Sequence, residues 1–229
     1  MPTPRILVIH RKYRLKGGED VFVHEHLVPT LKSMNCEIEF LEMPPLFKSL
    51  GTVFSDLLEF KFMFLGLEKL RPSYFKIKSQ CQKFNPTHVV FNNFIPTVSL
   101  AAPTAAKQLG ARTYSWVHNG RLSCANGLFF DGKDTCHKCL TNGSRSVLFQ
   151  NCFTSFFQRI IYSWVYRAQR VKNHLARNID EFICVSEYAR QGVMRALPQA
   201  KASVVYTEPA LTREPAGELT AAQKNQIQK

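Results

Sequence analysis

The sequence predicts an α/β fold in which a parallel sheet is covered by helices on both faces. Short apolar runs of strand length alternate with longer segments that carry apolar residues at helical spacing. The first run, residues 5–10 (RILVIH), is of the continuous kind found in strands that are buried on both faces. Polar residues follow several of the runs, at the positions where open parallel sheets bind ligands. These observations predict a doubly wound sheet within one large domain.

Composition narrows the class of protein and its partners. The chain has 229 residues, 45% of them hydrophobic, which is enough for a substantial buried core. Its net charge of +13 points to an anionic partner, which is a phosphate-bearing ligand, a nucleic acid or an anionic membrane surface. The N-terminus lacks the apolar run and cleavage site of a secretory signal, so we expect a cytoplasmic protein with reduced cysteines. No run reaches the roughly 18 apolar residues of a spanning helix, so membrane contact would be peripheral, at the inner face.

A glycine pair follows the first predicted strand. Gly17 and Gly18 end a basic loop and precede a predicted helix over residues 19–35. Glycines at such a junction let the backbone approach a ligand and leave helix N-terminal amides free for anionic oxygens. The alternative is an ordinary turn, with Glu19 and Asp20 serving only as acids that complement the helix dipole.

The next segments continue the alternation. Residues 36–43 predict a second strand, and residues 46–84 predict one or two amphipathic helices broken near Gly66 and Pro72. The run THVVFNN predicts a buried strand that ends in Asn92 and Asn93.

A helix over residues 99–110 is expected next, and then a strand over residues 111–119. This strand delivers His118 and Asn119 just past its carboxyl end. A lone histidine there is more often a surface or core residue than a catalytic one, so both interpretations stand.

A cysteine cluster follows this strand within residues 119–152. Cys124 is separated from Cys136 by eleven residues, Cys139 follows after two more, and Cys152 follows after a further twelve. Four thiolates so spaced are able to close around one tetrahedral zinc ion. The alternative is four reduced thiols that pack as small apolar groups.

The segment of residues 135–179 contains no Asp or Glu but many arginines and aromatic residues. We expect a long helix that packs one face on the sheet. Its other face is either merely solvated or rests on an anionic membrane surface, where each basic residue contributes about 1 kcal/mol.

The C-terminal part returns to the strand and helix pattern. The run FICV predicts a strand, Ser186 an N-cap, and residues 188–197 a helix. A last short strand is expected within residues 201–209, and residues 207–229 read as a polar linker or tail.

With these motifs in view, the chain resembles the N-terminal, acceptor-side domain of the family 4 glycosyltransferases, which have a GT-B fold of two Rossmann-like domains. The similarity runs from Arg5 to about Tyr206 and is carried by ILVIH with KGGEDVFVHEHL, by FNPTHVVFNNFIPTVS, and by IDEFICVSEYAR. Its most specific part is WVHNGRLSCANGLFFDGKDTCHKCL with the later Cys152. The resemblance implies a Rossmann-like domain over residues 1–206 that transfers a sugar from a nucleotide-sugar donor to a glycan or lipid-linked acceptor.

The resemblance also assigns roles to individual residues. It implies that His118 lies near the transferred sugar as the catalytic-site histidine, and that Gly17 and Gly18 lie near the donor diphosphate. The remaining expected substrate-binding residues are Asn92, Asn93, Asn119, Ser186 and Glu187. Many relatives have His-Asn where this chain has Asn92-Asn93, so one polar contact is expected to differ.

The family's second, donor-binding domain has no counterpart before Lys229. We therefore expect the chain not to be active alone and to need a donor-binding domain or subunit from elsewhere. The alternatives are a noncatalytic glycan- or membrane-binding module and the remnant of a truncated enzyme. Nucleic acid is not an expected partner, because the basic residues are scattered and no recognition helix stands out.

Overall fold

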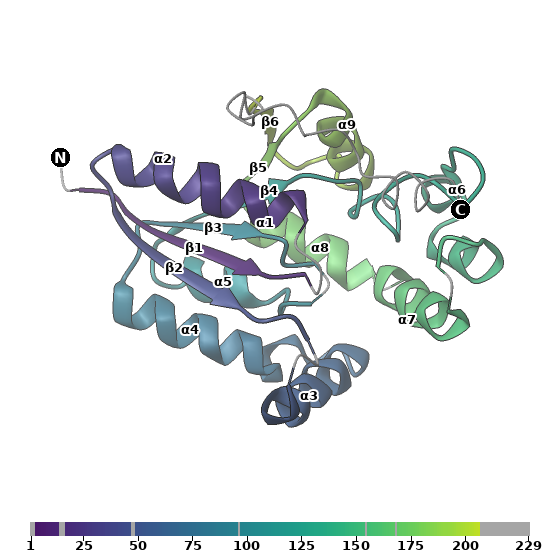
Figure 1. The fold of residues 1–229 in the computed structure, drawn as a ribbon, viewed down its shortest axis with the longest axis horizontal. Coiled ribbons are helices and arrows are strands. Elements are labelled where there is room, and N and C mark those ends of the chain that lie inside the picture. Colours follow the sequence, from purple (N-terminus) through teal and green to yellow (C-terminus); the bar gives the residue numbers. More distant parts are fainter. Residues whose placement is uncertain are drawn as a thin grey trace, which may run out of the picture.

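The structure is a computed structural model that describes residues 3–13, 17–46, 49–95, 97–153, 155–167 and 169–206, without the side chains of residues 50, 144, 165 and 169–172. The described residues form a three-layer α/β arrangement, in which a six-stranded, all-parallel sheet lies between helices (Figure 1). The predicted fold class is confirmed. The expected tail of residues 207–229 and residues 14–16 of the basic loop before Gly17 lie outside the described residues.

The strands occupy the segments predicted from the apolar runs, and their order is β2-β1-β3-β4-β5-β6. In the sheet, β2 lies on one side of β1 and β3 lies on its other side. The direction in which strands are added therefore reverses between β1 and β3. Such a reversal opens a crevice at the carboxyl ends of the strands, where ligands bind in this class of sheet. The bounds are β1 (Arg5–Arg11), β2 (Glu37–Met43), β3 (His88–Asn92), β4 (Arg112–Val117), β5 (Glu181–Cys184) and β6 (Ala202–Val204).

One face of the sheet is covered by the helical segment of α1 (Gly18–Val21), the π-helix η1 (Phe22–Leu27) and α2 (Val28–Ser33). Apolar side chains of this segment pack on Ile6, Val8 and Val90 of the sheet. The opposite face is covered by α4 (Pro72–Phe84), α5 (Ala102–Lys107), α8 (Gln169–Asn178) and α9 (Glu187–Ala196). Burial on both faces explains why the central strands are continuously apolar.

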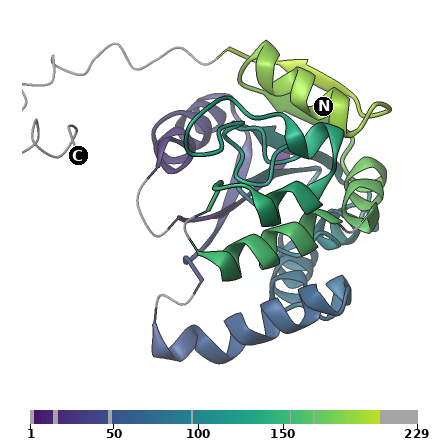
Figure 2. The ribbon, with the colours of Figure 1, turned by 90° about the vertical axis from the view of Figure 1, so that its right-hand side faces the viewer.

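Two further helices, α3 (Val53–Phe64) and α7 (Phe156–Arg167), lie side by side beyond the carboxyl ends of the strands (Figures 1 and 2). Phe64 and Trp164 join them, with ring centroids 4.8 Å apart. The short helices η2 (Leu50–Thr52), η3 (Glu68–Leu70), α6 (Lys138–Thr141) and η4 (Ser144–Phe149) complete this end of the molecule. Within the described residues, no helix is long and apolar enough to cross a membrane.

The single long helix expected over residues 135–179 is wrong. This segment forms α6, η4, α7 and α8 as separate elements. Gly143 adopts a φ of +69°, which interrupts the helix after Thr141, and residues 150–153 form bends rather than a helix. The basic and aromatic residues are therefore distributed over several short helices instead of one continuous face.

Candidate functional site

The sheet places polar side chains together at the carboxyl ends of β1, β3 and β4. His10 of β1 is the register partner of Asn92 of β3, and Asn92 is the register partner of Trp116 of β4. His118 follows β4 directly. The crevice where the strand order reverses thus carries the residues on which a ligand site of this sheet would be built.

A chain of hydrogen bonds runs through this edge of the sheet. Nε2 of His10 lies 2.8 Å from Oδ1 of Asp20, and Nδ1 of His10 lies 2.9 Å from Nδ2 of Asn92. The Oδ1 atom of Asn92 in turn lies 2.9 Å from Nε2 of His118. His10, Asp20 and Asn92 are buried, so each bond forms where an unpaired polar group would be costly.

These contacts determine the tautomers of both histidines. The Asn92 amide nitrogen donates to Nδ1 of His10, so His10 carries its proton on Nε2 and donates to Asp20. Since Oδ1 of Asn92 can only accept, His118 donates from Nε2. Burial, together with the nearby His10, lowers the pKa of His118 to about 4. His118 is therefore neutral at pH 7, with its Nδ1 left as an acceptor.

An open pocket of about 40 Å³ lies at the His118 end of this chain of hydrogen bonds. Such a volume admits little more than one hydroxyl-sized group, so a larger ligand would lie across the pocket and insert one group into it. The lining residues are Glu19, Asn93, Phe94, Ile95, Ser115, Trp116, Val117, His118, Asn119, Arg121 and Leu122.

The polar groups at the pocket are held by one another. Glu19 accepts a hydrogen bond from the Tyr13 hydroxyl at 3.0 Å and another from the Asn119 amide. The guanidinium of Arg121 lies over the Tyr13 ring, 5.2 Å from its centroid. Burial raises the pKa of Glu19, and Arg121 partly opposes this effect. The pocket thus presents a carboxylate, an amide and a guanidinium in fixed positions.

Trp116 provides the aromatic side of the pocket. Its ring lies 4.9 Å from Phe22 and 6.5 Å from His118 between centroids. Its Nε1 atom is buried and has no hydrogen-bond partner among the described residues. A buried indole N–H without a partner is uncommon, because tryptophan usually finds one. Trp116, a residue that lines the pocket, thus carries a donor that is unpaired within the described part of the chain.

The turn after β4 depends on two glycines. A Cβ atom at Gly120 would lie 2.2 Å from the Phe129 ring, so no other residue fits there without a shift. Gly127 has a φ of +80°, and a Cβ atom there would lie 2.7 Å from Cγ of Arg121 and 3.3 Å from Oδ1 of Asn119. This close packing keeps Asn119 and Arg121 at the pocket.

The structure brings together some of the residues expected from the sequence and separates others. His118, Asn93 and Asn119 line the pocket, and Asn92 lies directly beneath it. Gly17 lies one turn away, where its amide donates to Oδ2 of Asp20 at 2.9 Å, while the neighbouring Gly18 is exposed.

Ser186 and Glu187 do not line this pocket. Ser186 is the N-cap of α9, as expected, and accepts a hydrogen bond from the Ala189 amide. Glu187 forms a bidentate pair with Arg190 on the surface of the same helix, at 2.7 and 2.8 Å.

Several residues of the site were not identified from the sequence. Asp20 was interpreted only as a helix-start acid, yet it is buried and pairs with His10. Its position three residues after Gly17 is a capping-box signal, but the partner ten residues earlier is visible only in the fold. Trp116 and Arg121 carried no signal beyond their proximity to His118.

Cys124 and Cys139 form a hydrogen-bonded pair, and Cys152 lies close enough to interact electrostatically with Cys124, Cys136 and Cys139. The Cys139 thiol hydrogen-bonds to Cys124 and lowers the pKa of Cys124 to about 6, and backbone amides of residues 126, 127 and 129 act in the same direction. The same contact raises the pKa of Cys139. Cys152 is partly buried, which raises its pKa.

No site for the expected structural zinc is seen among the described residues, and zinc binding stays a prediction. Within the part of the chain that the structure describes, no group of three or more His, Cys, Asp or Glu side chains is placed so that it would hold a metal ion. The sulfur of Cys124 is held by Cys139 and by amides of its own turn, and Cys136 and Cys152 do not complete a tetrahedral set with them.

Comparison with known proteins gives matches by structure only. No family model matches the chain, and no curated protein matches it. Similar solved structures are a sugar transporter from Clostridium phytofermentans, a carbohydrate transporter from Acidothermus cellulolyticus 11B in complex with myo-inositol, and an ABC transporter solute binding protein from Burkholderia multivorans. Their identities are 11%, 11% and 10%, and their TM-scores are 0.32, 0.33 and 0.31. The matches cover 89%, 89% and 90% of this chain and 80%, 74% and 80% of those chains.

These findings contradict the resemblance to the family 4 glycosyltransferases. No family model supports a glycosyltransferase, and none of the similar structures reported has a glycosyltransferase title. The expected sugar transfer from a nucleotide-sugar donor is corrected accordingly, while the role of His118 as a site residue stays a prediction.

Proposed function

We propose that this chain is a noncatalytic carbohydrate-binding protein whose pocket at the carboxyl ends of β3 and β4 receives a sugar hydroxyl. The observation that carries the proposal is a small pocket lined by Glu19, Asn119 and Arg121 together with Trp116, whose indole N–H has no hydrogen-bond partner among the described residues. Sugars present hydroxyls that both donate and accept, and planar polar side chains bind such hydroxyls well. The Trp116 ring adds an apolar surface for the C–H face of the sugar.

The state of the polar groups supports binding rather than catalysis. A general base works best when its pKa lies near the working pH, and burial holds the pKa of His118 at about 4. Glu19, the one carboxylate among the lining residues, already accepts hydrogen bonds from Tyr13 and Asn119. Glycoside chemistry usually requires two carboxyl groups that face one bond. The pocket is therefore suited to hold a hydroxyl in place.

The two tryptophans allow a direct test by NMR of the full chain labelled with ¹⁵N. Glucose, galactose, mannose, N-acetylglucosamine and myo-inositol are titrated into the millimolar range, and both indole N–H signals are followed. The indole signal of Trp116 is expected to shift with at least one sugar. The signal of Trp164, which packs against Phe64 away from the pocket, serves as the internal control and is expected to stay in place.

A variant then assigns the binding to the pocket. Asn119→Ala removes an amide at the pocket and is expected to weaken binding about tenfold, as for the loss of roughly 1.4 kcal/mol. Lys32→Ala, on the exposed surface of α2, is the matched control. If no sugar in the panel moves the Trp116 signal, or if both tryptophans shift equally, the proposal is wrong.

A second candidate function is peripheral contact with an anionic membrane. It is favoured by exposed aromatic residues at the start of α7, where Phe156 and Phe157 are 65% and 68% exposed in a segment without acidic residues. Phosphatidylserine vesicles are expected to carry the protein with them in a flotation assay, whereas phosphatidylcholine vesicles are expected not to. A double Phe156→Ser, Phe157→Ser variant should lose flotation, whereas Phe75→Ser on α4 should keep it.

A further inference from the structure

A second cavity lies between α3 and α7, away from the sugar pocket. It has a volume of about 200 Å³, larger than the roughly 150 Å³ of a dry apolar cavity that holds benzene. Apolar side chains form most of its wall, and the side chains of Glu59 and Arg71 also line it. The lining residues are Leu46, Glu59, Phe60, Met63, Arg71, Thr97, Gln158, Ile161 and Tyr162.

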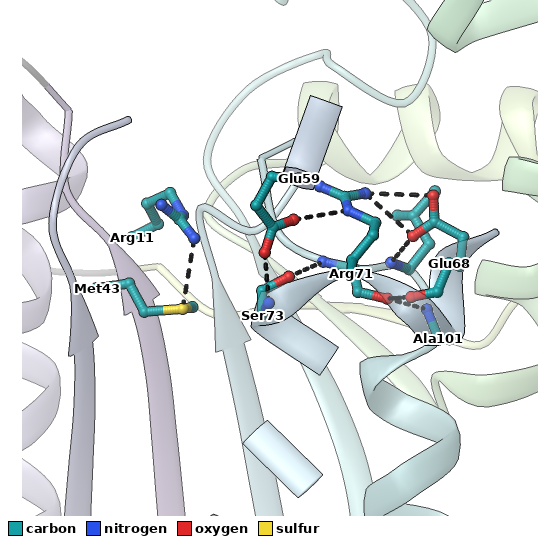
Figure 3. Close-up of polar contacts among 9 residues, drawn as sticks. Arg11, Met43, Glu59, Glu68, Arg71, Ser73 and Ala101 are labelled. Atoms are coloured by element: carbon teal, nitrogen blue, oxygen red, sulfur yellow. Dashed lines mark hydrogen bonds and ion pairs between the residues drawn. The ribbon is translucent and has the colours of Figure 1, made fainter. Parts of the chain in front are cut away.

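Glu59 and Arg71, which both line the cavity, form a buried ion pair (Figure 3). Nε of Arg71 donates to Oε2 of Glu59 at 2.7 Å, and the same guanidinium donates to Glu68 at 3.0 and 3.2 Å. The Ser73 amide donates to the other oxygen of Glu59. Arg71 is 1% exposed and Glu59 is 2% exposed, so both charges are removed from water and compensate each other.

This arrangement restricts the chemistry of an occupant. A carboxylate has about four lone-pair sites, and the hydrogen bonds from Arg71 and Ser73 occupy two of those on Glu59. A further neutral donor would therefore be accepted without disturbing the pair. An anionic head would face the carboxylate of Glu59 beside Phe60 and Met63, where burial of an unpaired charge is costly.

We propose that this cavity is a binding site for a small amphiphile, with an apolar body of about ten heavy atoms and one neutral hydroxyl that donates to Glu59. The apolar body lies between α3 and α7, against Met63 and Ile161. Gln158 is exposed and marks the side from which the ligand enters. The site is independent of the sugar pocket, because the two share no lining residue.

Two neighbouring isoleucines on α7 provide the test. Ile161 lines the cavity, whereas Ile160 is 42% exposed and does not. Binding of 4-propylphenol to the full chain is measured by isothermal titration calorimetry, with propylbenzene and 4-propylbenzoate as comparison ligands. We expect 4-propylphenol to bind, propylbenzene to bind about tenfold more weakly for lack of the hydroxyl, and 4-propylbenzoate not to bind.

The variants decide where the probe binds. Ile161→Trp fills the cavity and is expected to raise the dissociation constant of 4-propylphenol at least about tenfold, while Ile160→Trp leaves it unchanged. Equal weakening by both variants, or no binding of 4-propylphenol to the unmodified chain, overturns the proposal. Equal affinity for 4-propylphenol and propylbenzene overturns the assigned hydrogen bond to Glu59. Circular dichroism of each variant confirms that it is folded.

Discussion

The side chains of His118 and Asn92 are hydrogen-bonded across β4 and β3, with 2.9 Å between Nε2 and Oδ1. Through the other end of the same amide, His118 is linked to His10 and then to Asp20. The floor of the pocket lined by His118 and Trp116 is thus a single polar chain that crosses three strands and reaches α1. Its members depend on one another for hydrogen-bond partners, which leads to specific expectations for stability.

The stability of the protein should fall as the pH is lowered from about 6.5 to about 4. His118 has a pKa of about 4 in the folded chain, against 6.5 for an ordinary histidine. Between these values the unfolded state binds a proton that the folded state does not, so the free energy of unfolding decreases as pH falls, by at most roughly 3 kcal/mol. Above pH 6.5 His118 is neutral in both states, so this loss of unfolding free energy does not occur.

Urea denaturation of the wild type and of His118→Gln at several pH values measures this effect. Glutamine keeps a donor for Asn92 but does not titrate, so the variant is expected to show a shallower decline of stability below pH 6.5. Identical pH profiles for the two proteins would show that His118 is not responsible.

Replacement of Asp20 by alanine should destabilise the fold by about 2–4 kcal/mol. The change leaves Nε2 of His10 and the amide of Gly17 without their acceptor, and each unsatisfied buried donor costs about 1–3 kcal/mol. Thermal and urea unfolding give the value. Lys32→Ala on the exposed face of α2 is the control, and a comparable loss of stability in that variant would contradict the argument.

Gly120→Ala should destabilise the protein by about 1–3 kcal/mol, because the new methyl group would overlap the Phe129 ring. The matched control is Gly51→Ala, where no atom lies within 4 Å of the added Cβ. Shortening the ring side chain in a Gly120→Ala, Phe129→Leu double variant should recover part of the loss. Additive effects of the two substitutions would argue against a direct clash.

Arg71→Leu should destabilise the protein by about 3–5 kcal/mol, because Glu59 would remain as a buried charge without its partner. Adding Glu59→Leu removes that charge, so the double variant should be less destabilised than the two single effects combined. Arg190→Leu is the matched control: it breaks an arginine–glutamate pair that lies on the surface of α9, and it should change the unfolding curve little. Strict additivity at Arg71 and Glu59 would contradict the coupling.

Much of the fold was predictable because the strands are continuously apolar and the sheet is buried on both faces. The segments RILVIH and THVVF form β1 and β3, and the asparagines and histidine after them meet at one edge. That meeting follows from parallel strands alone, since their carboxyl ends share an edge of the sheet. The N-cap at Ser186 was also predicted from local chemistry.

The rest of the site depends on contacts between distant residues. Asp20 and His10 face each other only because α1 begins directly above β1, and no local pattern encodes that pairing. The expectation of one long helix over residues 135–179 followed the distribution of charge and overlooked Gly143. The family assignment was inferred from motif spacing, and no family model supports it. The zinc ion was inferred in the same way, and no site for it is seen among the described residues.

The order of the strands has a consequence for synthesis of the chain. β1 pairs with β2 and also with β3, and the bond from Asn92 to His10 spans 82 residues. A nascent chain that has emerged only as far as β2 can pair one edge of β1 with β2. The other edge of β1 stays unpaired until β3 follows. His118 comes later still, so a ribosome stalled before β4 would hold an intermediate with an unprotected strand edge that is prone to aggregate.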